Sequence, residues 1–204
     1  MTKSICALVH RPDSDREAFQ RYYEERHAPL GVRHFPFTRY VRNHLLDAPD
    51  IGFDTISEFW ADDIAATAAL MDGPVGEIMR ADEERFMDRS RIAPGGSDEH
   101  VLSAGALADA HEERYAVLIR YGAEDSMDMR DKVLGWASEM AERTSGVSVD
   151  FVQSWQTPAF PADAVLWTPD LSGNVPDQLA QSQVVRVRRV EAPAHTLLGR
   201  AQAQ

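Results

Sequence analysis

One order of secondary-structure elements occurs twice in this chain of 204 residues. In the first half, strands are predicted at 4–10, 38–46, 53–61 and 100–105, and helices at 16–27, 62–73 and 75–89. In the second half, strands are predicted at 114–121, 147–157, 162–168 and 184–190, and helices at 128–146 and 174–183. Each half therefore has the order β-α-β-β-α-β, which is the ferredoxin-like order.

This repeat predicts an α+β fold made of two ferredoxin-like units that together form an α+β barrel. The units are expected at residues 1–103 and 114–204, joined by a linker at 104–113. Helices cover only one face of such a sheet, so the bare face of each unit has to be buried. In a fused pair the two bare faces can close on each other, and we expect a cavity for a small molecule between them.

The charge of the chain excludes several classes of partner. The formal net charge is −12, and the short basic run at 186–190 alternates as an exposed strand face does, so no nucleic-acid partner is expected. No apolar stretch is long enough for a membrane span or a signal peptide, which predicts a cytoplasmic protein without a membrane partner. The single cysteine, Cys6, lies in an apolar strand-like run and is expected to be a buried, inert thiol.

The segment YYEERHAPLG, residues 22–31, contains the first candidate for chemistry, His27. At helical spacing this histidine belongs to an aromatic, inward-facing stripe that comprises Phe19, Tyr22, Tyr23, Arg26, His27 and Leu30. Pro29 is expected to kink or end the helix beside it. A buried histidine at this place either transfers protons or packs as a hydrogen-bonded structural residue.

Four ordered motifs carry a family resemblance. They are FQRYYEERHAPLG, RYVRNHLL, FDTISEFWADDIAATAAL and DEERFMD, within residues 5–88. In this order they resemble the EthD domain family, whereas the second half resembles it only in the order of its elements. The resemblance implies the fold of the dimeric α+β-barrel superfamily. Its members include dehydratases of aromatic polyketides, muconolactone isomerases, cyclases, and cofactor-free or haem-dependent oxygenases.

The same resemblance implies site residues. The positions that match the family motifs are His27, Pro29, Tyr40, Asn43, Asp54 and Trp60. No His-x-Pro recurs in the second half, where His27 aligns with Ala141. We therefore expect one active cavity per chain, with the second half supplying walls.

The predicted strands add further candidates by their alternation. Tyr40 and His44 share one face of their strand, and Asn43 points to the other face. On the next strand Asp54, Glu58 and Trp60 share the face predicted to look into the cavity. Glu58 is either a second acid or base or a solvated edge residue, and Trp60 either packs in the core or forms an aromatic platform. The candidate substrate-binding residues are Tyr22, Asn43, His44, Asp54, Glu58 and Trp60.

Cofactor motifs are missing from the sequence. No histidine and carboxylate have a recognised metal-ligand spacing, and no glycine-rich nucleotide loop occurs, so neither a metal site nor a bound nucleotide is expected. No cofactor is predicted, although haem stays open because one histidine suffices as its axial ligand.

These features favour a cofactor-free lyase, dehydratase or isomerase that acts on a hydrophobic, aromatic or cyclic carbonyl compound. His27 would transfer the proton, and Tyr23, Tyr40 or Asn43 would polarise the carbonyl oxygen. Two alternatives remain: a non-catalytic protein that binds a hydrophobic metabolite, and a haem-dependent or cofactor-free oxygenase that uses the same cavity. Exposed sheet edges leave a homodimer open.

Overall fold

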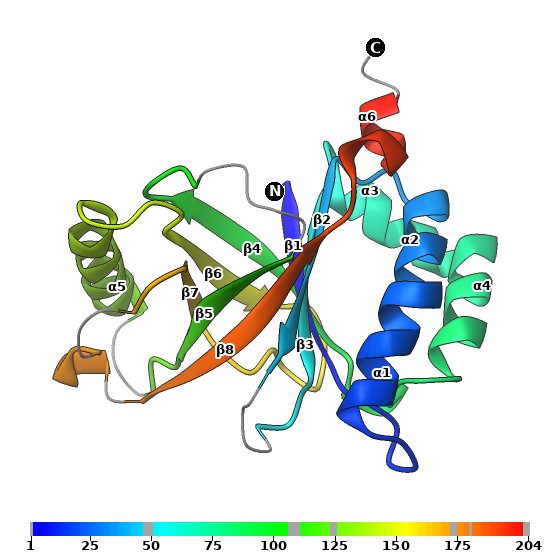
Figure 1. Ribbon diagram of the computed structural model, residues 1–204, viewed down its shortest axis with the longest axis horizontal. Coiled ribbons are helices and arrows are strands. Elements are labelled where there is room, and N and C mark those ends of the chain that lie inside the picture. Colours follow the sequence, from blue (N-terminus) through cyan, green and yellow to red (C-terminus); the bar gives the residue numbers. More distant parts are fainter. Residues whose placement is uncertain are drawn as a thin grey trace.

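Eight antiparallel strands close into a barrel within residues 2–46, 51–105, 111–122, 126–171, 175–179 and 181–201, which the computed structural model describes (Figure 1). Around the barrel they follow the order β1-β3-β2-β8-β5-β7-β6-β4. The strands are β1 (Lys3–Leu8), β2 (Arg39–Leu45), β3 (Thr55–Trp60), β4 (Ala93–Val101), β5 (His111–Ile119), β6 (Ser148–Ser154), β7 (Ala164–Thr168) and β8 (Ser182–Glu191).

Two sheets with the same strand order make up this barrel. The first half forms β4-β1-β3-β2 and the second half forms β8-β5-β7-β6, so the strands of each half follow the ferredoxin-like arrangement. The sheets join where β2 pairs with β8 and where β4 pairs with β6. The predicted α+β barrel of two ferredoxin-like units is confirmed, and a single chain closes it.

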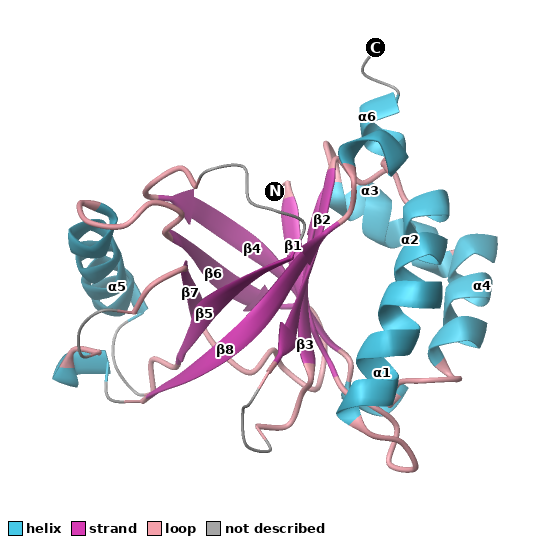
Figure 2. Cartoon of the chain, in the orientation of Figure 1, coloured by secondary structure: helices cyan, strands magenta, loops and turns pink. Residues whose placement is uncertain are grey.

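Helices lie outside the barrel and are distributed unequally between the halves (Figure 2). The first half carries α1 (Arg16–Tyr22), the π-helical turn η1 (Tyr23–His27), α2 (Ala28–His34), α3 (Ile64–Ala69), η2 (Leu70–Asp72), α4 (Pro74–Glu83) and η3 (Arg89–Arg91). The second half carries α5 (Ser126–Ala141), η4 (Asp177–Leu179), η5 (Ala194–Thr196) and α6 (Leu198–Ala201). In the described part of 174–183 the predicted helix is only the turn η4, because this segment offers few apolar side chains to bury.

The strand β4 corrects a second prediction. The sequence predicts a strand at 100–105, but the strand runs from Ala93 to Val101. A side chain at Gly95 would lie 2.8 Å from the backbone oxygen of Gln153 on β6. The glycine therefore permits a close approach of two strands rather than a turn. Residues 111–113, expected in the linker, belong to β5, and residues 106–110 of that linker lie outside the described residues.

Apolar side chains from both sheets pack against one another inside the barrel, where the sequence predicts a chamber, among them Ile5, Ala7, Ile56, Leu118, Val165, Trp167 and Val187. The charged side chains of Lys3, Glu58 and Asp150 are buried there as well. A separate apolar layer lies between the first-half sheet and its helices, with Cys6, Leu8, Phe19, Tyr23, Met79 and Phe86. The alternation of β1 decides which residues reach which layer.

Candidate functional site

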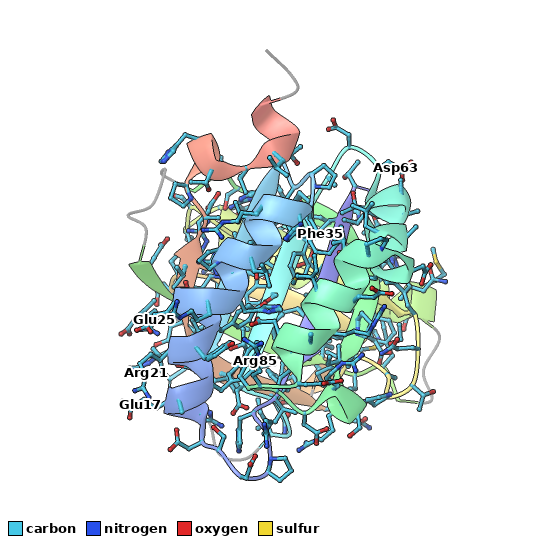
Figure 3. All side chains as sticks on the ribbon, turned by 90° about the vertical axis from the view of Figure 1, so that its right-hand side faces the viewer. Glu17, Arg21, Glu25, Phe35, Asp63 and Arg85 are labelled. Atoms are coloured by element: carbon cyan, nitrogen blue, oxygen red, sulfur yellow. The ribbon has the colours of Figure 1, made fainter. Side chains whose placement is uncertain are left out.

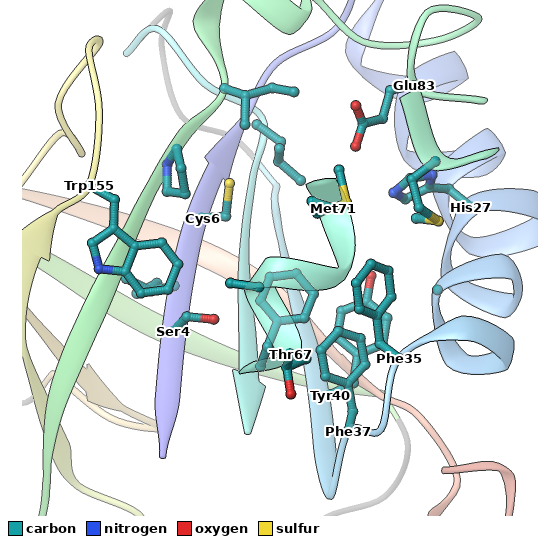
Figure 4. A pocket seen from close by; sticks show the side chains of 18 of the residues that line it. Ser4, Cys6, His27, Phe35, Phe37, Tyr40, Thr67, Met71, Glu83 and Trp155 are labelled. Atoms are coloured by element: carbon teal, nitrogen blue, oxygen red, sulfur yellow. The ribbon is translucent and has the colours of Figure 1, made fainter. Parts of the chain in front are cut away.

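A cavity of about 400 Å³ lies between the first-half sheet and the helices that cover it (Figure 4). Ser4 and Cys6 of β1 form part of its floor, and His27 and Glu83 face it from the helices. Many of the other lining residues are aromatic or sulfur-containing, among them Tyr23, Phe35, Phe37, Tyr40, Phe59, Met71, Met79 and Met87. This volume and apolar lining are typical of a small-molecule pocket.

A π-helical turn positions His27. The N–H of Ala28 donates to the carbonyl oxygen of Tyr23, five residues earlier, and the chain then continues as α2. Pro29 has no N–H and would crowd the carbonyl four residues before it in a regular α-helix. The irregular turn falls directly before this proline, and the chain stays helical to His34 instead of ending. Such turns frequently occur at functional sites.

The elements α1, η1 and α2 form one continuous helical rod. The outer side of this rod is charged, which fixes its orientation. Glu17, Arg21 and Glu25 are exposed along one flank (Figure 3). Phe19, Tyr23 and His27 are buried on the opposite side. The predicted inward stripe is therefore confirmed for Phe19, Tyr23 and His27. The helix places His27 over the sheet.

Asp82 of α4 holds the imidazole of His27. The Asp82 Oδ2 atom lies 2.9 Å from His27 Nδ1, and the hydroxyl of Tyr22 donates to Oδ1 at 2.8 Å. The hydrogen bond from His27 lowers the pKa of Asp82, so this carboxylate is ionised at neutral pH and can only accept. In the neutral imidazole, Nδ1 therefore carries the proton and Nε2 carries the lone pair.

His27 Nε2 is the atom that remains for a ligand. His27 is 7% exposed, lines the pocket, and packs against the rings of Tyr23 and Phe86 at centroid distances of 5.1 and 5.0 Å. Within the described residues no protein group forms a hydrogen bond with Nε2. A buried, oriented imidazole with one unpartnered nitrogen on a pocket can act as a proton acceptor.

Tyr23 and Tyr40 also line the pocket, but their hydroxyl groups bond to each other. The Tyr40 hydroxyl donates to Tyr23 Oη at 2.9 Å, and Tyr23 Oη lies 2.7 Å from Ser57 Oγ. Burial raises the pKa of both phenols well above its usual range. Both tyrosines therefore stay protonated, and in this arrangement they form a fixed wall beside His27.

Sequence reasoning missed several residues that line the pocket or hold His27. Asp82 and Glu83 lie in the motif DEERFMD, but no spacing rule connects this segment to His27, 55 residues away. Glu83 is buried and accepts a hydrogen bond from Arg89 at 3.1 Å. Cys6 is buried as expected, and burial raises the pKa of its thiol, but it faces the pocket. Trp155, which follows β6, brings the second half to the same pocket.

Asn43, Glu58 and Trp60 lie on the other face of the sheet, inside the barrel. The Asn43 amide donates to Glu58 Oε1 at 2.8 Å, and Arg114 also bonds to both Asn43 and Glu58. The Trp60 indole donates to Glu99 Oε2 at 2.9 Å. The three side chains are thus separated from His27 by the sheet and are engaged with protein groups.

Lys3 is the centre of this interior cluster. Its ammonium group lies 2.8 Å from Glu58, from Glu99 and from Asp150. Burial disfavours the charged form, but the three carboxylates raise the pKa of Lys3 above its usual value. The same surroundings lower the pKa of Glu58, against the effect of its burial, through Lys3 and Arg114. The cluster therefore sets two cations, Lys3 and Arg114, against three carboxylates, and burial raises the pKa of one of them, Asp150.

His44 and Asp54 attach the helical rod to the sheet. Both ring nitrogens of His44 are engaged, Nδ1 with Thr55 at 2.8 Å and Nε2 with Glu24 at 2.6 Å. Asp54 accepts from Arg16 at 2.9 Å and lies 2.7 Å from His10 Nδ1. Neither residue lines the pocket.

No group of three or more histidine, cysteine, aspartate or glutamate side chains is arranged to hold a metal ion in the described part of the chain. In the same part, every helix falls short of the length and apolar character that a membrane span requires.

Comparison with known proteins places the first half in a family. Residues 11–90 match the model of the EthD domain. An EthD family protein from Bacillus halodurans C-125 is 21% identical, covers 47% of this chain and 97% of its own, and has a TM-score of 0.36. No curated protein sequence matches the chain.

Two solved structures share the whole architecture. A candidate monooxygenase from Lactobacillus acidophilus NCFM is 12% identical, with coverage of 95% of this chain and 96% of its own and a TM-score of 0.53. An anthrone oxidase-like protein is 9% identical, with coverage of 95% and 92% and a TM-score of 0.52. At these identities the likeness concerns the fold. Residues 11–90 of this closed α+β barrel are therefore similar to the EthD domain.

Proposed function

We propose that the chain binds a hydrophobic carbonyl compound in the pocket between the sheet and the helices, and that His27 removes a proton from the carbon next to the carbonyl group. The unpartnered Nε2 of a buried, carboxylate-held imidazole on an apolar pocket of about 400 Å³ carries this proposal. The substrate is a cyclic or aromatic molecule, because aromatic rings and methionines form a large part of the pocket lining.

In the proposed step, Nε2 accepts the proton and the electron pair of the broken C–H bond moves into the enolate. Asp82 stabilises the imidazolium that forms, since its carboxylate already accepts the hydrogen bond from Nδ1. The apolar walls exclude water, which strengthens this electrostatic interaction. The enolate can be reprotonated elsewhere or can expel a leaving group, which correspond to an isomerase and a dehydratase.

A cofactor-free oxygenase would share the same first step. The names of the two structural neighbours, a candidate monooxygenase and an anthrone oxidase-like protein, favour this second candidate. An enolate that reacts with molecular oxygen in the pocket would give an oxygenated product instead of a rearranged one.

A bound haem is an alternative occupant of the pocket. His27 would hold the haem iron through Nε2, which faces the cavity, while Nδ1 is bonded to the carboxylate of Asp82. Haem bound there would supply redox chemistry with oxygen, and Asp82 would orient its ligand. A Soret band that appears on haem addition and is lost in His27→Ala would support this occupant.

Proton exchange measures the proposed step without knowledge of the natural substrate. With the bicyclic ketone 2-tetralone in D₂O, the protein should accelerate deuterium incorporation next to the carbonyl, as followed by proton NMR. His27→Ala should lower that acceleration by about 10²-fold or more while the protein stays folded. Equal exchange with the variant, or no acceleration by the wild-type protein, would contradict the proposal. Retained 2-tetralone binding without any exchange would instead identify a binding protein.

A further inference from the structure

A second polar atom faces the pocket from the sheet side. Ser4 of β1 is 8% exposed and lines the cavity, and Figure 4 shows its hydroxyl group directed into it. Among the residues that the structure describes, no protein group accepts or donates a hydrogen bond at Ser4 Oγ. A hydroxyl group without a protein partner at a pocket wall is available to a ligand.

Two neighbouring hydroxyl groups differ from that of Ser4 because they have protein partners. Ser57 of β3 lies on the same face of the sheet, and its Oγ atom is 2.7 Å from Tyr23 Oη. Thr67 of α3 lines the same pocket and donates to the backbone oxygen of Asp63 at 2.8 Å. Ser57 and Thr67 thus satisfy their hydroxyl groups within the protein, and Ser4 does not.

Trp155 indicates the class of ligand that Ser4 would meet. Ser4 lies opposite Gly96 of β4, and the N–H of Trp155 donates to the backbone oxygen of Pro94 in the same strand at 3.1 Å. The Trp155 side chain lines the pocket and is 44% exposed, so its indole forms part of the rim. An indole face favours flat aromatic partners.

We infer that Ser4 is a substrate-binding residue whose hydroxyl group donates a hydrogen bond to an oxygen atom of an aromatic substrate. The inference rests on the proposed pocket, and it assigns the recognition of the substrate's oxygen to β1 rather than to the tyrosines. His27 approaches the ligand from the helix side and Ser4 from the sheet side (Figure 4). The substrate is therefore a planar aromatic molecule that carries a hydroxyl or carbonyl oxygen.

Two probes that differ by one oxygen test this inference. The dissociation constants of 2-naphthol and naphthalene are measured by calorimetry for the wild-type protein, Ser4→Ala and Ser57→Ala. Ser4→Ala should weaken 2-naphthol binding about five- to tenfold and leave naphthalene binding unchanged. The melting temperature of Ser4→Ala should equal or exceed that of the wild type, because no protein hydrogen bond is lost. Ser57→Ala should lower the melting temperature without discriminating between the probes.

Equal losses for both probes in Ser4→Ala, unchanged 2-naphthol binding, or no binding of 2-naphthol to the wild-type protein would each overturn the inference. His27→Ala distinguishes this failure from failure of the proposed function. That variant should lose the exchange of 2-tetralone whether or not Ser4 contributes to binding. If Ser4 has no role but His27 still drives exchange, only the assignment of Ser4 falls.

Discussion

Lys3 and Ser4 are consecutive residues of β1, yet they face opposite sides of one sheet with opposite consequences. Lys3 points into the barrel, where its ammonium group contacts three carboxylates. Ser4 points toward the helices, where its hydroxyl group has no partner among the described residues. The interior face carries polar groups that satisfy one another, whereas the helix face leaves His27 Nε2 and Ser4 Oγ exposed to a pocket. Buried polar groups with partners stabilise the fold, and those without partners indicate where a ligand binds.

The strongest test of this comparison removes the cation of the interior face. Lys3→Met should lower the free energy of unfolding by about 3–5 kcal/mol, because Glu58 and Asp150 would remain buried without their shared partner. Chemical denaturation measures this change. Lys132→Met breaks an exposed pair with Asp128 and should cost less than about 1 kcal/mol. Similar values for the two variants would mean that the interior cluster is not a structural unit.

On the helix face the largest expected effect is on the rate. Asp82→Asn should reduce the exchange of 2-tetralone about 100-fold, because an amide can hold the wrong tautomer of His27 and cannot stabilise its cation. Tyr22→Phe removes only the second hydrogen bond to Asp82 and should reduce the rate a few-fold. NMR exchange rates at matched protein stability provide the comparison, and an unaltered rate in Asp82→Asn would remove Asp82 from the mechanism.

The second half should influence ligand binding through Trp155, in the loop that follows β6. Trp155→Ala should weaken 2-naphthol binding about tenfold, since an aromatic contact at the pocket rim is lost, and Trp155→Phe should restore most of it. Trp136→Phe, in the helix α5 away from the pocket, serves as the control and should leave binding unaltered. Calorimetry that shows the same affinity for Trp155→Ala and the wild type would confine the pocket to the first half.

The smallest expected effect concerns the attachment of η1 to the sheet. Burial alone would raise the pKa of Glu24, but hydrogen bonds from His44 and Arg42 lower it from 4.5 to about 2. A lowered folded-state pKa contributes stability above pH 4.5, and that contribution is lost as the pH falls toward 2. Glu24→Gln should therefore flatten the loss of stability between pH 4.5 and 2, by less than about 1 kcal/mol at this partly exposed site.

The neighbouring residue, Glu25, provides the control for the loss of stability at low pH. Glu25 is exposed on the outer flank of the same rod (Figure 3). Glu25→Gln should leave the dependence of unfolding on pH as it is in the wild type. An identical profile for Glu24→Gln would show that the contacts of Glu24 contribute nothing to folding.

The sequence allowed the barrel to be predicted because strand alternation and element order are local properties. It assigned Tyr40 and His44 to one face of β2 and Asn43 to the other, as the structure has them. The sequence predicted the cavity on the wrong face of the first-half sheet, inside the barrel instead of under the helices. Filling of that interior depends on Lys3, Asp150 and Arg114, which are brought together from three strands far apart in the chain. The pairing of His27 with Asp82 is equally non-local.

The central claim is that His27 presents an unprotonated Nε2 atom to a ligand while Nδ1 donates to Asp82. Nitrogen-15 NMR of histidine-labelled protein, with and without 2-tetralone, measures both features directly. The structure predicts that His27 is the tautomer protonated at Nδ1 and that its Nε2 resonance shifts on binding. A His27 ring protonated at Nε2 when neutral, or resonances that 2-tetralone leaves in place while it binds, would contradict the claim.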